Sequence, residues 1–155
     1  MKEKKCWGEV EHGFNYPDCG TSYLQVEAGW RCSVHFHQDR HNDFRVLSGC
    51  IVVGTCYGDG RMIPTILGPG ESFTAPKLSA HFFGVLEKGV VLETYWADVD
   101  RGLVHREDIV RFDQGGRWGM GDQFNPIAGK VKDFQKWYAG KTWRETTIQV
   151  LDSEN

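Results

Sequence analysis

Two histidines separated by a single residue, His35 and His37, are the residues of this sequence best suited to chemistry. They lie in an alternating segment typical of a β-strand. Successive side chains of a strand point to opposite faces, so both imidazoles would leave the same face. A third histidine, His81, follows after several Gly- and Pro-marked turns. Three imidazoles on neighbouring strands can bind zinc, iron, nickel or copper.

The alternative for each of these histidines is a structural role, because a single histidine on an apolar strand is usually a hydrogen-bonded core residue. One His-x-His pair would not decide between the two interpretations. The third histidine, His81, favours the metal site, because three ligands can then converge on one interior.

Length and charge limit the class of protein. The chain has 155 residues and a net charge of −3. It is long enough for one domain with a substantial core, so residues 1–155 are predicted to form a single domain. The absence of a basic excess argues against nucleic acid as the main partner.

The cysteines and the uncharged segments indicate a cytoplasmic protein. Five cysteines occur without a CxxC pair, namely Cys6, Cys19, Cys32, Cys50 and Cys56. Together with the lack of a signal-peptide pattern after Met1, this predicts reduced thiols and a cytoplasmic location. The longest uncharged run, 46–58, is too short for a membrane span.

The first hundred residues are predicted to be all-β. Beyond a short strand around Cys6–Val10, eight runs rich in aromatic and β-branched residues are separated by Gly or Pro. These runs are Thr21–Glu27, Arg31–His37, Asp43–Leu47, Cys50–Tyr57, Met62–Leu67, Ser72–Ala75, His81–Leu86 and Val90–Ala97. Their spacing favours an antiparallel sandwich or barrel, here expected over about residues 5–113.

The C-terminal extension, about residues 114–155, has a different pattern. A glycine-rich loop is followed by a helix predicted over Lys130–Tyr138 and a final strand over Glu145–Leu151. Its four large apolar side chains are Phe134, Trp137, Tyr138 and Trp143. We expect the extension to pack outside the barrel or to form a homodimer contact, since such groups rarely remain in water.

The spacing of the histidines resembles the two cupin motifs. In the first motif, Gly, His-x-His, Glu and Gly follow one another at fixed spacings. This sequence keeps every spacing, with Asn42 in place of Glu, at Gly29, His35, His37, Asn42 and Gly49. The second motif is matched by Gly70, Pro76 and His81, with Leu78 at its inner Gly. The resemblance implies a cupin-type double-stranded β-helix, a jelly-roll barrel. It also implies a divalent transition metal (zinc, nickel, iron or manganese) on His35, His37, Asn42 and His81.

A narrower resemblance is to type II mannose-6-phosphate isomerases and the cupin domain of mannose-1-phosphate guanylyltransferases. It rests on Lys5–Gly8, Ser33–Asn42 and Glu107–Asp113. This resemblance implies a sugar or sugar-phosphate isomerase or epimerase. Such an enzyme moves a proton between adjacent carbons, which requires a base and benefits from a metal ion.

The residue that would move this proton is not obvious. Asn42 stands where the family has Glu, and an amide cannot accept a proton near neutral pH. Asp39 and His41 are the predicted catalytic candidates, with Asp43 as a further candidate that a one-residue bulge would turn inward. For Asp39 and His41 the alternative is a solvated loop residue.

Two arginines are predicted to recognise an anionic ligand, because guanidinium groups bind phosphate or carboxylate bidentately. By resemblance Arg40 and Arg111 approach the substrate, and Arg111 is also a candidate catalytic residue. The alternative for Arg111 is an ion pair with Asp108 or Asp113.

Three classes of function follow from these residues. The first is a metal-dependent sugar or sugar-phosphate isomerase or epimerase. The second is an iron-dependent dioxygenase that uses the three histidines. The third is a non-catalytic cupin that binds a small molecule such as a carbohydrate, which Asn42 favours. The fold cannot choose among them, because the site carries the function.

Overall fold

The computed structural model describes residues 2–56, 62–98 and 108–119, and these ranges contain only strands, turns and loops. The strands are β1 (Lys2–Lys5), β2 (Gly8–Asn15), β3 (Cys19–Val26), β4 (Trp30–Arg31), β5 (His35–Phe36), β6 (Arg40–Cys56), β7 (Met62–Leu67), β8 (Ser72–Ala75), β9 (Ala80–Ala97), β10 (Val110–Arg111) and β11 (Gly116–Arg117). Within these ranges no helix is long and apolar enough to cross a membrane.

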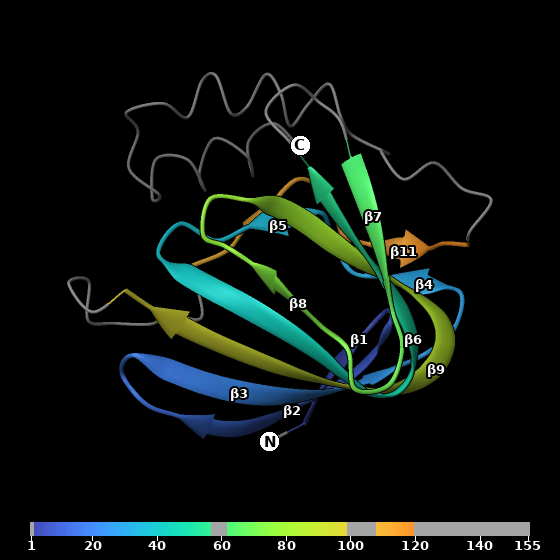
Figure 1. Ribbon diagram of the computed structural model, residues 1–155, viewed down its shortest axis with the longest axis horizontal. Coiled ribbons are helices and arrows are strands. Elements are labelled where there is room, and N and C mark those ends of the chain that lie inside the picture. The colour runs from blue at the N-terminus through green and yellow to red at the C-terminus, as the bar shows by residue number, and fades with distance from the viewer. Residues whose placement is uncertain (1, 57–61, 99–107, 120–155) are drawn as a thin grey trace.

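All strand pairs are antiparallel and belong to one strongly curled sheet. The order runs β1-β2-β3-β9-β4-β11, while β6 pairs with β7, β8 and β9. In Figure 1, β2 and β3 lie at the bottom of the barrel, β5 lies toward the top, and β4 and β11 lie on the right. The predicted all-β jelly-roll barrel is confirmed.

The two longest strands, β6 and β9, are each predicted as two strands but are continuous. They pair along most of their length, with register shifts between Val46 and Ile51. Gly49 has a φ of 82°, and a Cβ on Gly89 would stand 1.9 Å from the Ser48 carbonyl oxygen. Both glycines therefore let the paired strands bend together. Gly49 does not end β6, and Gly89 does not end β9.

Other boundaries differ because of local backbone hydrogen bonding. The strand predicted around Cys6–Val10 is confirmed from Gly8 on, where β2 begins, whereas Cys6 and Trp7 form the turn of a hairpin that begins at Lys2. The predicted strand over Arg31–His37 is two short strands, β4 and β5, separated at residues 32–34. The predicted C-terminal helix, the final strand and the four apolar residues Phe134, Trp137, Tyr138 and Trp143 lie outside the described residues.

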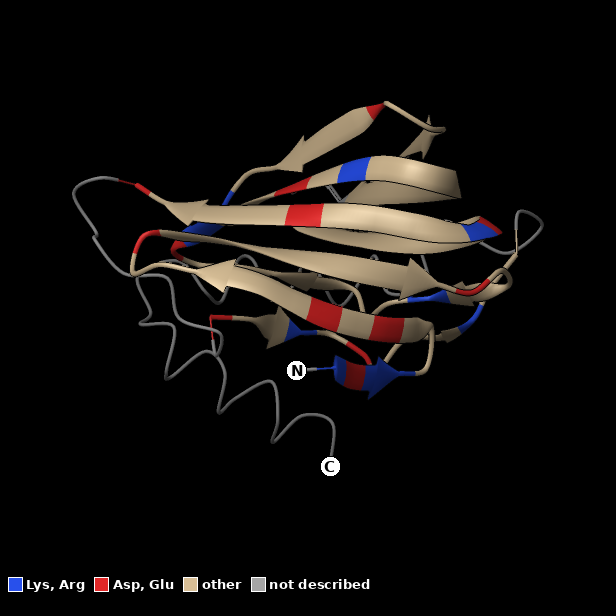
Figure 2. Ribbon diagram, turned by 90° about the horizontal axis from the view of Figure 1, so that it is seen from below, with Lys and Arg blue, Asp and Glu red and all other residues tan. Residues whose placement is uncertain are grey.

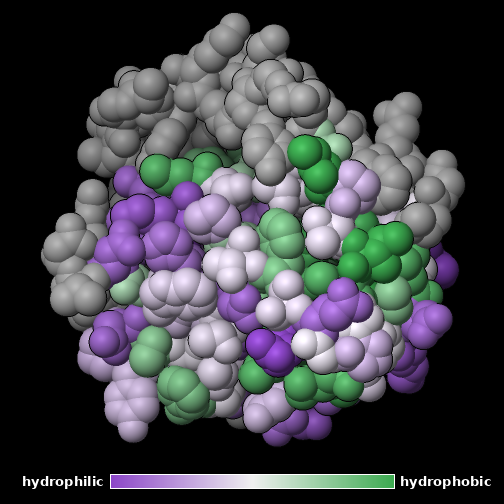
Figure 3. Space-filling view, viewed as in Figure 1, coloured by the Kyte–Doolittle hydropathy of each residue, from purple (hydrophilic) through white to green (hydrophobic). Residues whose placement is uncertain are grey.

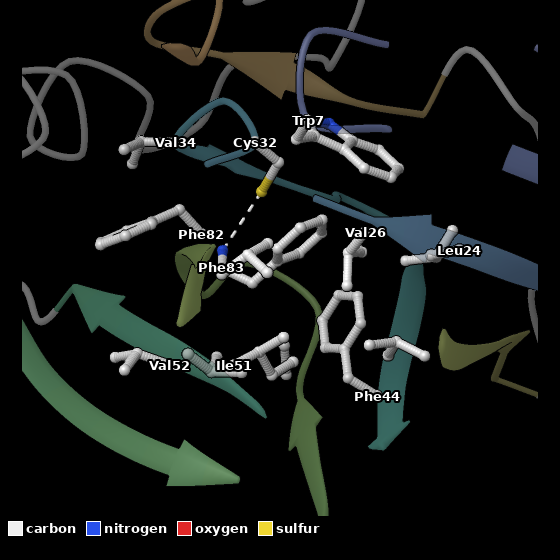
Figure 4. Packing of buried hydrophobic residues seen from close by; sticks show 14 of the residues in the cluster. Trp7, Leu24, Val26, Cys32, Val34, Phe44, Ile51, Val52, Phe82 and Phe83 are labelled. Carbon is white, nitrogen blue, oxygen red and sulfur yellow. Dashed lines mark hydrogen bonds between the residues drawn. The ribbon is translucent and has the colours of Figure 1, made fainter. Parts of the chain in front are cut away.

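The core fills the inside of the curled sheet. Figure 4 shows Trp7 against Phe83, with ring centroids 5.0 Å apart, and the backbone N–H of Phe83 donating to the Cys32 thiol at 3.2 Å. Phe44 also contacts Phe83, at 6.0 Å between centroids. Burial raises the pKa of Cys32 to about 12, so this thiol is a core group and not a nucleophile.

The described surface mixes polar and apolar groups. Figure 2 shows blue and red segments interspersed on the strands seen from that side. In Figure 3 the apolar areas on the right lie where Figure 1 places β7, which carries the exposed Ile63 and Ile66. Among the described strands β7 pairs only with β6, so its other edge has no strand partner there.

Leu78 has a φ of 65°, at the position where the cupin motif has Gly. Its N–H donates to the His37 carbonyl at 2.6 Å, and its side chain is 47% exposed. A side chain in this conformation costs about 1 kcal/mol or more.

We expect Leu78→Gly to be about 0.5 to 1 kcal/mol more stable than Leu78→Ala in urea unfolding, since only Gly removes the Cβ. Equal stability of the two variants would show that this backbone carries no strain.

Candidate metal centre and cavity

His35, His37 and His81 form a compact buried cluster. In the register of β5 and β9, His35 stands directly opposite His81. The ring centroids lie 4.6 Å apart for His35 and His81, 5.0 Å for His35 and His37, and 5.6 Å for His37 and His81. The three predicted histidines therefore meet inside the barrel.

Each of these rings is anchored through its Nδ1 atom. The Nδ1 of His35 lies 2.8 Å from the Ser33 carbonyl oxygen, and that of His81 lies 2.8 Å from the Ser79 carbonyl oxygen. The Nδ1 of His37 lies 2.5 Å from the Asp108 carbonyl oxygen. A carbonyl only accepts, so the rings of His35 and His81 carry their protons on Nδ1 and leave the Nε2 lone pair for another partner. The Nδ1 of His37 also lies 3.2 Å from the Nε of Arg40.

The cluster fits a transition-metal ion. One ligand atom from each ring lies within 4.8 Å of the others, and the Nε2 of His81 is buried without a hydrogen-bond partner. Bonds of about 2.1 Å to an ion allow at most about 4.2 Å between two nitrogens, so small ring movements would complete the site. Three imidazoles held by carbonyl bonds on their far side are a common zinc or iron arrangement.

Burial keeps the three imidazoles neutral. Removal from water lowers the pKa of His35 and His37 well below the usual value and lowers that of His81 to about 4. The positive charge of Arg40 lowers all three further. Neutral rings are the form that binds a metal, so no proton has to be displaced at pH 7.

Asn42 borders this cluster, and Glu93 holds its side chain. The Asn42 amide nitrogen donates to Glu93 Oε1 at 2.6 Å and lies 3.2 Å from His37 Nε2. The Asn42 Oδ1 atom is buried and has no hydrogen-bond partner in the described part of the chain. Burial raises the pKa of Glu93, and the Arg40 charge opposes that rise. The carboxylate of Glu93 therefore contacts the histidine cluster only through Asn42, the amide that occupies the position of the motif glutamate.

A cavity of about 800 Å³ opens beside the cluster. His35 contributes to its wall, together with Arg40, Arg111 and Glu93. Apolar and aromatic side chains line much of the remainder, namely Trp7, Val10, Leu24, Phe44, Phe83 and Tyr95. A volume of this size accommodates a small organic ligand.

Solved structures resemble this chain in fold. KdgF from Halomonas sp. matches with a TM-score of 0.55 and 19% identity, over 66% of this chain and 91% of that chain. Oxalate decarboxylase from Bacillus subtilis matches with a TM-score of 0.60 and 15% identity, over 72% of this chain and 29% of that chain. The chain has the cupin fold. CapF matches with a TM-score of 0.57 and 18% identity, over 72% of this chain and 33% of that chain.

At these identities the likeness establishes the cupin fold and leaves the activity open. No protein-family model matches the sequence, and no curated protein matches it. The chain spans about a third or less of oxalate decarboxylase and CapF. One structure of the Bacillus subtilis oxalate decarboxylase is described by its Mn(II) centres, so a protein of this fold holds manganese.

The predicted catalytic residues His41 and Asp39 do not border the cavity. His41 Nε2 lies 2.8 Å from Asp98 Oδ1, and its ring stacks on Trp96 at 5.4 Å. Asp39 lies in the loop before β6. Asp43, which a bulge would have turned inward, instead accepts a bond from the Thr74 hydroxyl at 2.9 Å. The register shifts of β6 begin only after residue 46, so Asn42 and not Asp43 faces the histidines.

Arg40 and Arg111 do border the cavity, as the anion-binding prediction requires. The Arg40 guanidinium lies 5.0 Å from the centre of the Tyr95 ring, and Arg111 pairs with His35 in the register of β10 and β5. Neither has a carboxylate within 4 Å in the described ranges. The alternative ion pairs of Arg111 are not formed, because Asp113 binds Arg31 and Asp108 binds backbone.

Asp108 and Glu93 are the site residues that the sequence interpretation missed. The Asp108 carboxylate accepts the backbone N–H groups of Gln38, Asp39 and Arg40 at 2.7, 2.8 and 3.0 Å, which fixes the loop after His37. No spacing in the sequence signals this contact. Glu93 does have a signal, because it is the one charged residue on the alternating inward face of Val90–Ala97.

The lowered pKa of His81 makes the metal-free protein sensitive to acid. The unfolded chain takes up a proton near pH 6.5 and the folded chain only near pH 4, so stability is complete above 6.5 and falls between those values. From pH 7 to 5, His81 alone should cost about 2 kcal/mol of unfolding free energy. Urea unfolding of EDTA-treated protein measures this loss. Between pH 7 and pH 5 the His81→Gln variant should lose about 2 kcal/mol less unfolding free energy than the wild type. An unchanged pH dependence in the variant would mean that His81 is accessible to protons when folded.

Proposed function

We propose that this chain is a metal-binding cupin that isomerises or epimerises a sugar or sugar phosphate. One observation carries the proposal. Three buried imidazoles meet beside a cavity whose wall also carries one partly buried carboxylate and two arginines that form no ion pair with the described residues. Metal, anion and proton-transfer groups are thus present in one space.

Each group has a distinct role in such a reaction. A divalent ion on His35, His37 and His81 would polarise a carbonyl oxygen of the substrate. Arg40 and Arg111 would hold an anionic group such as phosphate. Glu93 replaces His41 and Asp39 as the candidate for moving the proton, because it borders the cavity and burial raises its pKa toward the working pH.

A non-catalytic binding protein is the second candidate, and the orientation of Asn42 favours it. The amide nitrogen of Asn42 faces His37 Nε2, where a carboxylate would add negative charge to the metal. The iron-dependent dioxygenase rests on the three histidines alone and has no further observation in its favour. The homodimer and the cytoplasmic location also belong to this proposal. The aromatic residues expected to form the dimer contact, Phe134, Trp137, Tyr138 and Trp143, lie outside the described residues.

Metal analysis tests the first part of the proposal. We expect the purified protein to carry one divalent transition-metal ion per chain, and His37→Ala and His81→Ala to lose most of it, because each removes one of three ligands. Elemental analysis of gel-filtered samples measures this content. His41→Ala is the matched control, since His41 binds Asp98 outside the cluster and its loss should leave the metal in place. Equal metal content in all four proteins would refute the site.

Turnover on a panel that includes mannose 6-phosphate and fructose 6-phosphate tests the second part. If Glu93 moves the proton, Glu93→Gln should slow isomerisation by about 100-fold or more while metal content stays unchanged. Asp43→Asn is the matched control. It removes a carboxylate on β6 that binds Thr74, away from the cavity, and should keep full activity. A metal-loaded wild-type protein that binds these sugars without converting them would favour the non-catalytic alternative.

A further inference from the structure

The side chain of Asn42 is held in one orientation by a carboxylate. Asn42 is 1% exposed, and its amide nitrogen lies 2.6 Å from Glu93 Oε1 and 3.2 Å from His37 Nε2. A carboxylate only accepts hydrogen bonds, so the amide atom beside Glu93 is the nitrogen and not the oxygen. A half turn of the amide would bring two oxygens into contact. Glu93 therefore determines which end of the amide faces the histidines.

The second N–H of this amide is directed at an atom suited to metal binding. The Nδ1 of His37 lies 2.5 Å from the Asp108 carbonyl oxygen, so Nε2 is the atom left for a metal ion. An amide N–H only donates, so it uses the lone pair of Nε2 as its acceptor. When His37 binds an ion, that lone pair is no longer available to Asn42. A buried donor without an acceptor is costly, so we expect a new acceptor to replace Nε2.

The charges around the cluster favour an anion as this acceptor. Basic residues outnumber acidic ones on the described cavity wall, namely Lys4, Lys5, Arg40 and Arg111 against Glu3 and Glu93. Arg40 lies beside the cluster, with its Nε 3.2 Å from His37 Nδ1. The Asp108 carboxylate is already bound by three backbone N–H groups. A glutamate at position 42 would repel an anionic oxygen, whereas an amide N–H attracts one.

We propose that Asn42, oriented by Glu93, is a hydrogen-bond donor to an anionic oxygen of the ligand and not a ligand of the metal. A carboxylate and a phosphate both supply such an oxygen. Asn42 is almost completely buried and is absent from the wall that the described residues form around the cavity, so only an oxygen that enters the histidine cluster reaches its N–H. The inference rests on the metal centre of the proposed function and requires no turnover.

Cobalt(II) binding to EDTA-treated protein tests this role, with acetate as the anionic probe and imidazole as the neutral probe. Competition with a chromophoric chelator measures metal affinity, and the visible absorption of the cobalt-loaded protein measures probe affinity. Asn42→Ala should bind cobalt about as tightly as wild type but acetate about 10-fold more weakly, the effect of one hydrogen bond to a charged group. Imidazole has no anionic oxygen and should bind both proteins equally.

Gln25→Ala is the matched control, because it removes an exposed side-chain amide from the outer face of β3. It should bind cobalt and both probes as wild type does. Thermal unfolding of each variant checks that the fold is retained. A second measurement needs no substitution: in isotope-labelled wild type, the NMR signals of the Asn42 side-chain N–H groups should shift when zinc is added and shift again with acetate.

The possible outcomes separate this inference from the metal centre itself. Weaker cobalt binding by Asn42→Ala would make Asn42 a metal ligand and overturn the inference. Unchanged acetate affinity, no acetate binding to the cobalt-loaded wild type, or Asn42 signals that do not respond to acetate would also overturn it. Each of these results leaves the metal centre intact. A wild-type protein that binds neither cobalt nor zinc would refute the metal centre and, with it, the inference.

Discussion

The pairing of β6 with β9 is the interaction on which the rest of this protein depends. These strands are the longest in the sheet, and they bend together where Gly49 and Gly89 bring the two backbones into contact. The shared bend curls the sheet, which gives a single interior instead of two open faces. It also brings His81, near the start of β9, into the same interior as Asn42, near the start of β6. A side chain larger than hydrogen at either glycine would push these strands apart.

The interior that results is unusual in holding many polar groups, and each is held by a specific contact. Backbone carbonyls fix the three imidazole rings, and Asp108 fixes the loop between His37 and β6 through three backbone N–H groups. Glu93 in turn fixes the Asn42 amide. Low polarity around these groups strengthens every such contact and makes each unpaired group costly. The same surroundings keep the three imidazoles neutral, which is the form that can bind a metal ion.

Much of the fold could be predicted from local patterns. Alternation and Gly or Pro boundaries located β7 and β8 at Met62–Leu67 and Ser72–Ala75, as predicted. The same rules divided β6 and β9 wrongly, because a glycine in a strand marks either an end or a bend and only the partner strand distinguishes them. The interruption at residues 32–34 was also missed, since it depends on hydrogen bonds to distant segments such as Phe83 and Phe112.

For the site, the sequence by itself determined the three histidines, since the two-residue period of a strand puts His35 and His37 on one face and motif spacing adds His81. It also determined the two arginines that border the cavity. Only the tertiary structure decided between Asn42 and Asp43, removed His41 and Asp39 from the cavity wall, and brought in Glu93 and Asp108. The reason is physical: periodicity assigns a side chain to a face, but cross-strand register and the curl of the sheet determine which residues on that face meet.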